Sequence, residues 1–282
     1  MRALLFAPLL FLACSPASTE TSFDPADSGT ASDTATAAET SSGSSLLFRV
    51  RTNTKPFAHA DGLAGQTSSQ TKQGIRKLRI YRDASDGAPV TVFDHGKGFV
   101  EAGYDDGNDT LVGTAKLATI PAARYTLARI TVTHSKYRVV STLHVGGVGY
   151  PGTFDCVQTL SNDVTLDGAT HPMGWYRYVF TTAGMSYPQE GTGAPLPTSP
   201  GTGGFTLKAE GAESYYEMPI DLTVTVDPKS DLTLVTEVNM DRSFRWEDQA
   251  LVGYAKDIYD TTPTDREPVR RFGANSYVVK VE

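Results

Sequence analysis

The chain has 282 residues, of which 39% are hydrophobic and 20% are charged. This composition indicates a globular protein with a buried core, and it excludes a wholly disordered chain and a protein made of membrane-spanning helices. The formal net charge of −7 argues against non-specific binding to nucleic acid, so no nucleic-acid partner is expected.

The first thirteen residues have the pattern of an export signal. Arg2 supplies a positive charge, and the apolar run over 3–13 is far too short to span a bilayer. The run ends in Phe11-Leu12-Ala13-Cys14, which resembles the lipobox of bacterial lipoproteins. The resemblance implies that residues 1–13 are a lipoprotein signal peptide and that Cys14 is the lipid attachment site. An ordinary secretory signal cut nearby is the alternative.

The position after Cys14 bears on localisation. Two or three acyl chains hold a protein stably on a membrane, whereas one chain does so only marginally. By resemblance to enteric lipoproteins, Ser15 in place of Asp favours the outer membrane. We therefore expect a protein of the bacterial cell envelope whose first partner is the membrane, reached through its lipid anchor. The sequence leaves open whether the protein lies on the periplasmic face or on the outer surface of that membrane.

Residues 14–45 have the composition of a disordered tether. They consist mainly of Ser, Thr, Ala, Asp, Glu, Gly and Pro, and they include no Lys or Arg. Such a segment buries too little apolar surface to offset the entropy of the chain. As a flexible coil it spans about 30 Å. The tether is expected to hold the body away from the membrane.

From residue 46 onwards, apolar residues alternate with polar ones, which is the pattern of half-buried strands. No sustained helical period is present, and Gly, Pro and Asp residues separate the runs. This pattern predicts the all-β class and an antiparallel β-sandwich over residues 46–282. The clearest predicted strands are 46–51, 75–82, 90–94, 111–118, 125–133, 137–145, 175–181, 205–208, 221–227, 232–240 and 276–281.

Acidic residues gather in one short segment. Residues 105–109 read Asp-Asp-Gly-Asn-Asp and resemble one calcium-binding nonapeptide of the RTX toxins. The chain has only one copy, so an RTX roll is not expected. Ca²⁺ takes oxygen ligands in flexible geometry, and the candidate metal ligands here are Asp105, Asp106, Asn108 and Asp109. A solvated hairpin turn is the alternative. No cofactor is expected apart from this ion.

The segment Ile120-Pro121-Ala122-Ala123-Arg124-Tyr125-Thr126 leads into a predicted strand. It resembles the Leu-Pro-x-Gly-x-Tyr turn of prealbumin-like (transthyretin-like) sandwich domains, with Ala123 at the place of the glycine. The resemblance implies such a sandwich, in which the tyrosine enters the core, and a lipoprotein family of binding or stalk modules. An immunoglobulin-like sandwich is the other option.

One predicted strand is rich in aromatic residues. Its alternation places Trp175 and Arg177 on one face and Tyr176 and Tyr178 on the other. One face of a strand in a two-layer sandwich points outward. We therefore predict that Trp175, Tyr176, Arg177 and Tyr178 contribute to a ligand-binding patch for a carbohydrate or an envelope protein. The alternative is that these residues belong to a core strand and a sheet edge and bind no ligand.

A long insertion follows this strand. Ten of the 21 residues in 184–204 are Gly or Pro, and the segment lacks a strand pattern. We expect a long exposed loop within a single sandwich domain.

The sequence carries no recognised catalytic motif. Its five histidines form neither His-x-His nor His-x-x-x-His, and it lacks a Gly-x-Ser-x-Gly elbow and a Walker loop. Cys156 has no disulfide partner if Cys14 carries a lipid, so a buried, inert thiol is expected. The expected function is non-enzymatic ligand binding, adhesion or a structural role. A calcium-dependent binding module is the alternative, and an envelope hydrolase is the third option.

Overall fold

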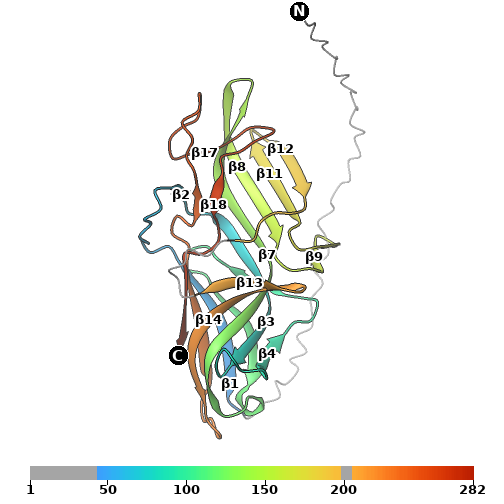
Figure 1. The fold of residues 1–282 in the computed structure, drawn as a ribbon, viewed down its shortest axis with the longest axis vertical. Helices are drawn as coiled ribbons and strands as arrows, with labels where there is room; N and C mark the ends of the chain where they lie inside the picture. The colour runs from blue at the N-terminus through green and yellow to red at the C-terminus, as the bar shows by residue number, and fades with distance from the viewer. Residues whose placement is uncertain (1–42, 198–204) are drawn as a thin grey trace, which may run out of the picture. The chain divides into compact units, whose positions relative to one another are not determined.

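The computed structural model describes residues 43–197 and 205–282, and nearly all of its elements are β-strands (Figure 1). This confirms the all-β class and a sandwich-like arrangement of antiparallel, curled sheets. One short 3₁₀ turn, Leu117–Thr119, is the helical element of the described residues. No helix between residues 43 and 197 or between 205 and 282 is long and apolar enough to span a membrane. Cys14 lies outside the described residues, as does most of the predicted tether.

A four-stranded sheet forms one layer of the sandwich. Its order is β19 (Ser276–Val281), β15 (Leu232–Asn239), β1 (Ser45–Asn53) and β6 (Asp109–Lys116). β1 pairs in parallel with β15 and antiparallel with β6. Buried residues alternate strictly with half-buried ones along β1, so one face of the sheet points into a core.

The second layer is a ten-stranded sheet built around β7 (Ala123–Val145), a strand of 23 residues. β7 pairs with β3 (Ser69–Tyr81), β8 (Val148–Thr159) and β14 (Glu213–Val224). The other strands of this sheet are β4 (Val90–Asp94), β5 (Val100–Gly103), β11 (Tyr176–Thr182), β12 (Met185–Gly191), β13 (Thr206–Glu210) and β17 (Tyr259–Thr261).

Two small sheets complete the body. β9 (Val164–Leu166) pairs with β10 (Ala169–His171). β16 (Phe244–Trp246) lies between β2 (Ala64–Gln66) and β18 (Val269–Arg271), in a three-stranded sheet whose strands are only three residues long.

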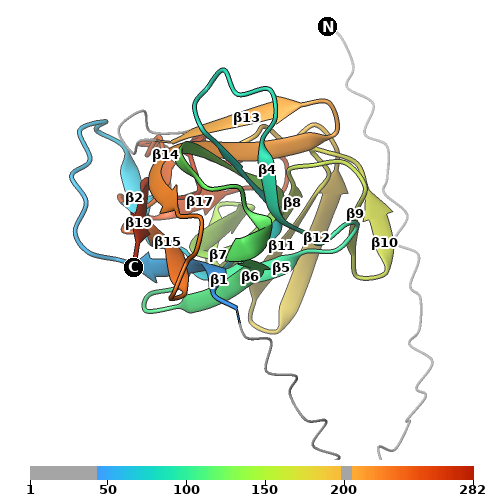
Figure 2. The same ribbon diagram turned by 90° about the horizontal axis from the view of Figure 1, so that it is seen from below.

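The larger hydrophobic cluster, which we call the main core, lies between the two large sheets. Figure 2 shows β1 and β6 on one side of the body and β13 and β14 on the other. β7 contributes to this core with the residues before Thr133. Its fully buried side chains include Leu46, Phe48, Leu78, Ile80, Tyr125, Ala128, Leu222 and Leu234. This packing of sheet on sheet produces a closed interior of mostly aliphatic side chains.

A second cluster, which we call the aromatic core, lies against the other half of β7. It contains Phe244, Trp246 and Tyr259, which pack on Val139, and other aromatic side chains surround them. Most of the cluster comes from the short strands of the C-terminal third of the chain. β17 pairs with the end of β7, as Figure 1 shows. One long strand therefore supports two cores of different composition.

The continuity of β7 corrects the prediction of two separate strands at 125–133 and 137–145. Thr133, His134 and Ser135 are buried polar residues, so they interrupt the hydrophobic alternation without interrupting the strand. Their polar groups have partners. For example, the Gln73 side-chain amide donates to the His134 carbonyl at 2.7 Å, and the backbone amide of Leu160 donates to the carbonyl of Thr133 at 2.7 Å.

The segment 184–204 also differs from the prediction of a long loop, because β12 occupies Met185–Gly191 and pairs with β11. All residues of β12 except the last are exposed, so the strand has no buried face to produce an alternating pattern. Pro188 is tolerated because β12 is an edge strand of its sheet. Residues 192–197 lack regular structure, and 198–204 lie outside the described residues.

Candidate functional site

The register between strands brings aromatic side chains into rows on one face of the large sheet. Phe180 on β11 lies opposite Phe154 on β8 and opposite Tyr187 on β12. In the next row, Tyr178 lies opposite Cys156. Side chains directly opposite each other share a face and contact one another. This face therefore carries one row of three aromatic rings across β8, β11 and β12, and Tyr178 in the row beside it.

The opposite face of the same strands is polar. Arg138 pairs with Asp155 at 2.6 Å, and Arg177 lies 3.4 Å from Glu190. Such cross-strand ion pairs are typical of a solvated face. The alternation along β11 thus directs Tyr178 inward and Arg177 toward solvent.

Two cavities lie between the aromatic face and the C-terminal third of the chain. The larger has a volume of about 610 Å³, within the usual range for small-molecule sites, and the smaller has about 220 Å³. Phe154, Tyr178 and Arg266 line both cavities, so we treat the two as one site and call it the aromatic cleft. The larger cavity is also lined by Leu143, Phe180, Tyr187 and Gln189, and the smaller by Tyr137, Phe244 and Tyr259.

Residues 261–266 form the loop that closes one side of the larger cavity. A β-bridge between Thr261 and Arg266 joins its ends, and the Thr262 hydroxyl accepts a hydrogen bond from the amide of Asp265 at 2.9 Å. The guanidinium of Arg266 lies over the ring of Tyr178, 4.8 Å from its centroid. Burial raises the pKa of Tyr178 to about 12, so its phenol is protonated and able to donate at neutral pH.

Buried acidic groups hold this loop in place. The Asp260 carboxylate lies 2.7 Å from Nε2 of His144 and accepts a hydrogen bond from the amide of Ala255. Glu267, which is fully buried, accepts hydrogen bonds from the amides of Gln249 and Asp260 at 2.6 and 2.8 Å. Burial raises the pKa of Glu267. Glu267 lines the smaller cavity, whereas His144 and Asp260 line neither cavity. These two residues therefore support the cleft without forming its surface.

A second polar cluster lies where β7 passes between the two cores. The Nε2 atom of His134 is 3.1 Å from Glu101, which also pairs with Lys136 at 2.7 Å and with Lys72 at 2.9 Å. The hydrogen bond with His134, together with the two lysines, lowers the pKa of Glu101 despite its burial. Burial lowers the pKa of His134, so the imidazole is neutral at pH 7. These groups satisfy one another and line neither cavity.

The four residues predicted to bind a ligand have different surroundings. Tyr178 lines the cleft, and the ring of Tyr176 stacks on it with centroids 4.5 Å apart. Arg177 lies on the polar face with Glu190. Trp175 precedes β11 and stacks on His171 at 3.6 Å. The structure thus brings the two tyrosines together, while Arg177 and Trp175 line neither cavity.

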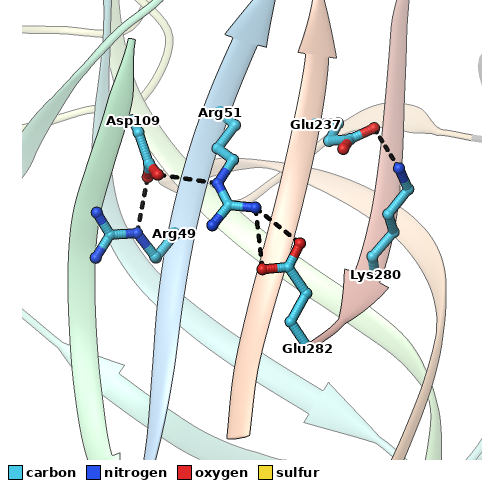
Figure 3. A network of polar contacts seen from close by, with 6 residues as sticks. All are labelled: Arg49, Arg51, Asp109, Glu237, Lys280 and Glu282. Carbon is cyan, nitrogen blue, oxygen red and sulfur yellow. Dashed lines mark hydrogen bonds and ion pairs between the residues drawn. The ribbon is translucent and has the colours of Figure 1, made fainter. Parts of the chain in front are cut away.

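Three of the predicted calcium ligands lie on the loop before β6, and the fourth, Asp109, is the first residue of that strand, on the outer face of the four-stranded sheet. Figure 3 shows Asp109 between two arginines, with Arg49 Nε at 2.7 Å and Arg51 Nε at 2.9 Å. Burial would raise the pKa of Asp109, but the arginines outweigh it and the pKa is lowered. Arg51 also pairs with Glu282, and Lys280 pairs with Glu237 beside it. Asp109 is thus part of a surface charge network.

The other three candidate ligands make hydrogen bonds with the backbone. Asp105 accepts from the amide of Thr71 at 3.0 Å, and Asp106 accepts from the amide of Thr54 at 2.9 Å. Asn108 donates its side-chain amide to the carbonyl of Asp105. In the part of the chain that the structure describes, no group of three or more His, Cys, Asp or Glu residues is arranged to hold a metal ion. Calcium binding at this loop stays a prediction.

Several cleft residues were not anticipated from the sequence. Tyr187 lies on β12, which was not predicted as a strand, and Phe154 lies on β8, which has no clear alternation. Phe180 follows Tyr178 by two positions on the same strand, so the alternation of the sequence is a signal that could have placed it on the same face. Arg266 comes from a distant loop and has no sequence signal for this role. Cys156 is a free, buried thiol whose pKa is raised by burial.

Comparison of the chain with protein-family models, with curated proteins and with solved structures finds no match. The prealbumin-like resemblance therefore stays a prediction. The tyrosine that carries it, Tyr125, is fully buried in the main core, and its hydroxyl donates to the carbonyl of Pro121 at 2.7 Å.

Proposed function

We propose that this protein is a bacterial envelope lipoprotein, anchored through Cys14, whose β-sheet body binds a carbohydrate in the aromatic cleft without breaking bonds. The observation that carries the proposal is the cleft itself. It combines a face of aromatic rings with a rim of polar side chains, at a volume of about 610 Å³. Small-molecule sites are typically pockets of this size, lined by apolar and aromatic side chains with a few polar groups.

A sugar ring suits this combination of groups. One side of the ring presents C–H groups that pack on an aromatic face, and its edge carries hydroxyls that donate and accept hydrogen bonds. Tyr178 and Tyr187 supply aromatic faces with polar hydroxyls. Gln189, Thr262 and Thr264 supply amide and hydroxyl groups beside them. Because these residues come from three separate segments, a ligand is held on several sides.

The ligand-binding test uses the purified full-length protein and an array of neutral and acidic oligosaccharides. The Tyr178→Ala variant is expected to lower the affinity for any bound sugar at least tenfold, because it removes a ring that both cavities share. Trp175→Ala is the matched control, since it removes an aromatic ring that lines neither cavity. Absence of binding to every sugar, or binding that depends on Trp175 and not on Tyr178, overturns the proposed site.

The anchor is tested separately. Cells expressing the protein are labelled with a radioactive fatty acid, and the membrane fraction is examined. The wild-type protein is expected to carry label and to sediment with membranes, and Cys14→Ala is expected to lose both. Label that persists in the variant would show that the lipid is attached elsewhere or that Cys14 is not the anchor.

A further inference from the structure

We propose that the aromatic cleft selects acidic saccharides and that Arg266 binds their carboxylate. This inference rests on the proposed carbohydrate site and names the class of sugar that the site takes. The inference follows from the position of the Arg266 guanidinium, from its contact with Tyr178 and from the hydrogen bonds that the neighbouring carboxylates already make.

Arg266 is the one basic residue that lines the aromatic cleft, and it lines both cavities. Its side chain is half-buried. In the described residues no carboxylate lies within ion-pair distance of its guanidinium, and the guanidinium makes no hydrogen bond to protein. The guanidinium carbon lies 4.8 Å from the centroid of the Tyr178 ring. A cation in this position is held by the ring and has no counter-charge from residues 43–197 or 205–282.

The arginines on the other face of the same sheet differ from Arg266. Arg138 and Arg177 each have a carboxylate partner, Asp155 and Glu190. These pairs lie on the solvated face, where a counter-charge matters least. Of these three arginines, Arg266, which lines the cleft, is the one without a carboxylate partner among the described residues. A ligand anion would complete that site.

The acidic residues beside Arg266 do not neutralise it. Both carboxylate oxygens of Glu267 accept hydrogen bonds from backbone amides, of Gln249 and Asp260. The side chain of Asp265 is exposed and accepts from the backbone amide of Arg266, not from its guanidinium. Arg266 thus lines both cavities with a guanidinium that neither Glu267 nor Asp265 pairs with.

The chemistry of the guanidinium favours a carboxylate as the ligand group. The guanidinium carbon lies over the Tyr178 ring, and the planar group carries five N–H donors around its edge. A carboxylate accepts two of these donors in parallel, which is a strong and directional contact. A sugar whose ring packs on the aromatic face while its C6 carboxylate reaches Arg266 satisfies both features. The ligand class is therefore a uronic-acid-type saccharide.

The test compares matched pairs of trisaccharides that differ only at C6, by calorimetric titration of the full-length protein. The pairs are galactose and galacturonate, glucose and glucuronate, and mannose and mannuronate oligomers. In at least one pair, the acidic sugar is expected to bind at least tenfold more tightly than its neutral partner. This preference should weaken as salt is raised, because a charge pair at a cleft mouth is partly screened.

Variants of Arg266 separate charge from shape. Arg266→Gln is expected to remove the acidic preference and leave the affinity for the neutral sugar within about twofold. Arg266→Lys keeps the charge but loses the two parallel donors, so an intermediate preference is expected. Arg177→Gln, on the opposite face, is the control and should change nothing. Thermal unfolding of each variant shows whether the body is intact.

Each outcome decides between the proposals. Equal binding of acidic and neutral sugars, sensitive to Tyr178→Ala, overturns the acidic preference and leaves the carbohydrate site standing. An acidic preference that survives in Arg266→Gln places the anion elsewhere and also overturns it. If sulfated sugars bind as well as carboxylated ones, the site recognises charge and not the carboxylate. Absence of binding to all pairs overturns the carbohydrate site as well.

Discussion

The two halves of β7 lie in contrasting surroundings. The half before Thr133 is enclosed between two long sheets, and its neighbours in the main core are mostly aliphatic. The other half packs on an aromatic core supplied by strands of three residues, and two cavities remain beside it. A single strand with one pattern of alternation thus borders both the closed main core and the aromatic core, which has cavities beside it.

The difference teaches how this fold separates stability from binding. Two long strands or sheets that face each other bury side chains in regular layers and leave few voids. Short strands joined by irregular loops cover an aromatic face incompletely, because they cannot follow its full length. The uncovered rings then form a cleft that a ligand can complete. We therefore expect mutations in the main core to lower mainly the free energy of unfolding, and mutations in the aromatic cleft to lower mainly the affinity for a ligand.

The largest expected effect is in the main core. Phe48→Ala removes a ring that is fully buried in β1, and such changes cost about 3–5 kcal/mol of unfolding free energy. Tyr178→Ala removes a half-buried ring beside an existing cavity and should cost much less, while abolishing sugar binding. Urea unfolding of the full-length protein measures both. Equal losses would contradict the division between a stabilising core and a binding cleft.

The next largest effect concerns the packing under the cleft. A Cβ added at Gly152 would contact the backbone carbonyl oxygen of Thr181 and would lie 2.8 Å from Cζ of Phe180. Overpacking of this kind costs about 1–3 kcal/mol, and it should also displace the aromatic row. Gly87→Ala is the control, since nothing lies within 4 Å of its added Cβ. Thermal unfolding checks both variants, and a Gly152→Ala protein as stable as the control would be evidence against the close packing.

A smaller effect depends on pH and lies at the junction of the two regions. The pKa of His134 is lowered from its ordinary value of 6.5 by burial, so the unfolded chain binds this proton first as the pH falls below 6.5. The pKa of Glu101 is also lowered, which adds stability above its ordinary value of 4.5 that is lost at lower pH. Each unit of displacement is worth about 1.4 kcal/mol.

Stability is therefore expected to fall in two stages as the pH is lowered, the first beginning near pH 6.5 and the second near pH 4.5. Glu101→Gln removes the carboxylate and should flatten the stage below pH 4.5, while the decline that begins near pH 6.5 remains. Urea unfolding at a series of pH values measures this profile. A variant with the same profile as the wild type would assign the acid sensitivity to other groups.

The smallest effect is expected at the 105–109 loop on the surface of the main core. Because Asp109 is paired with two arginines and its neighbours accept backbone amides, the unfolding temperature should be the same in EDTA and in millimolar calcium. A bound ion at a hundredfold excess over its dissociation constant would add about 2.7 kcal/mol. A rise that Asp109→Asn abolishes would show that the loop rearranges to bind calcium.

The sequence predicted the regular parts of the fold better than the site. The strand at Val90–Asp94 was predicted with its observed bounds, and β1, β6 and β15 were placed within three residues at each end. Alternation succeeded there because one face of each strand is buried. It failed for β12, whose residues are nearly all exposed, and it divided β7 at its buried polar residues.

The candidate site was predicted only in part. The aromatic strand β11 was recognised, and Tyr178 does line a cavity. The prediction could not separate Tyr178 from Arg177, because two neighbours on a strand differ only in the face they present. Which face is covered depends on the C-terminal third of the chain. Arg266 lies 88 positions beyond Tyr178 in the sequence, and no local pattern connects the two.

By itself, the sequence determined the all-β class, most strand positions and the polar composition of residues 14–45, because these depend on local composition and on a period of two. The tertiary structure alone decided that β7 supports two cores, that the 261–266 loop meets the aromatic face and that Asp109 lies between two arginines. The reason is that register and layer packing join residues far apart in the chain, and the chemistry of a site arises from those contacts.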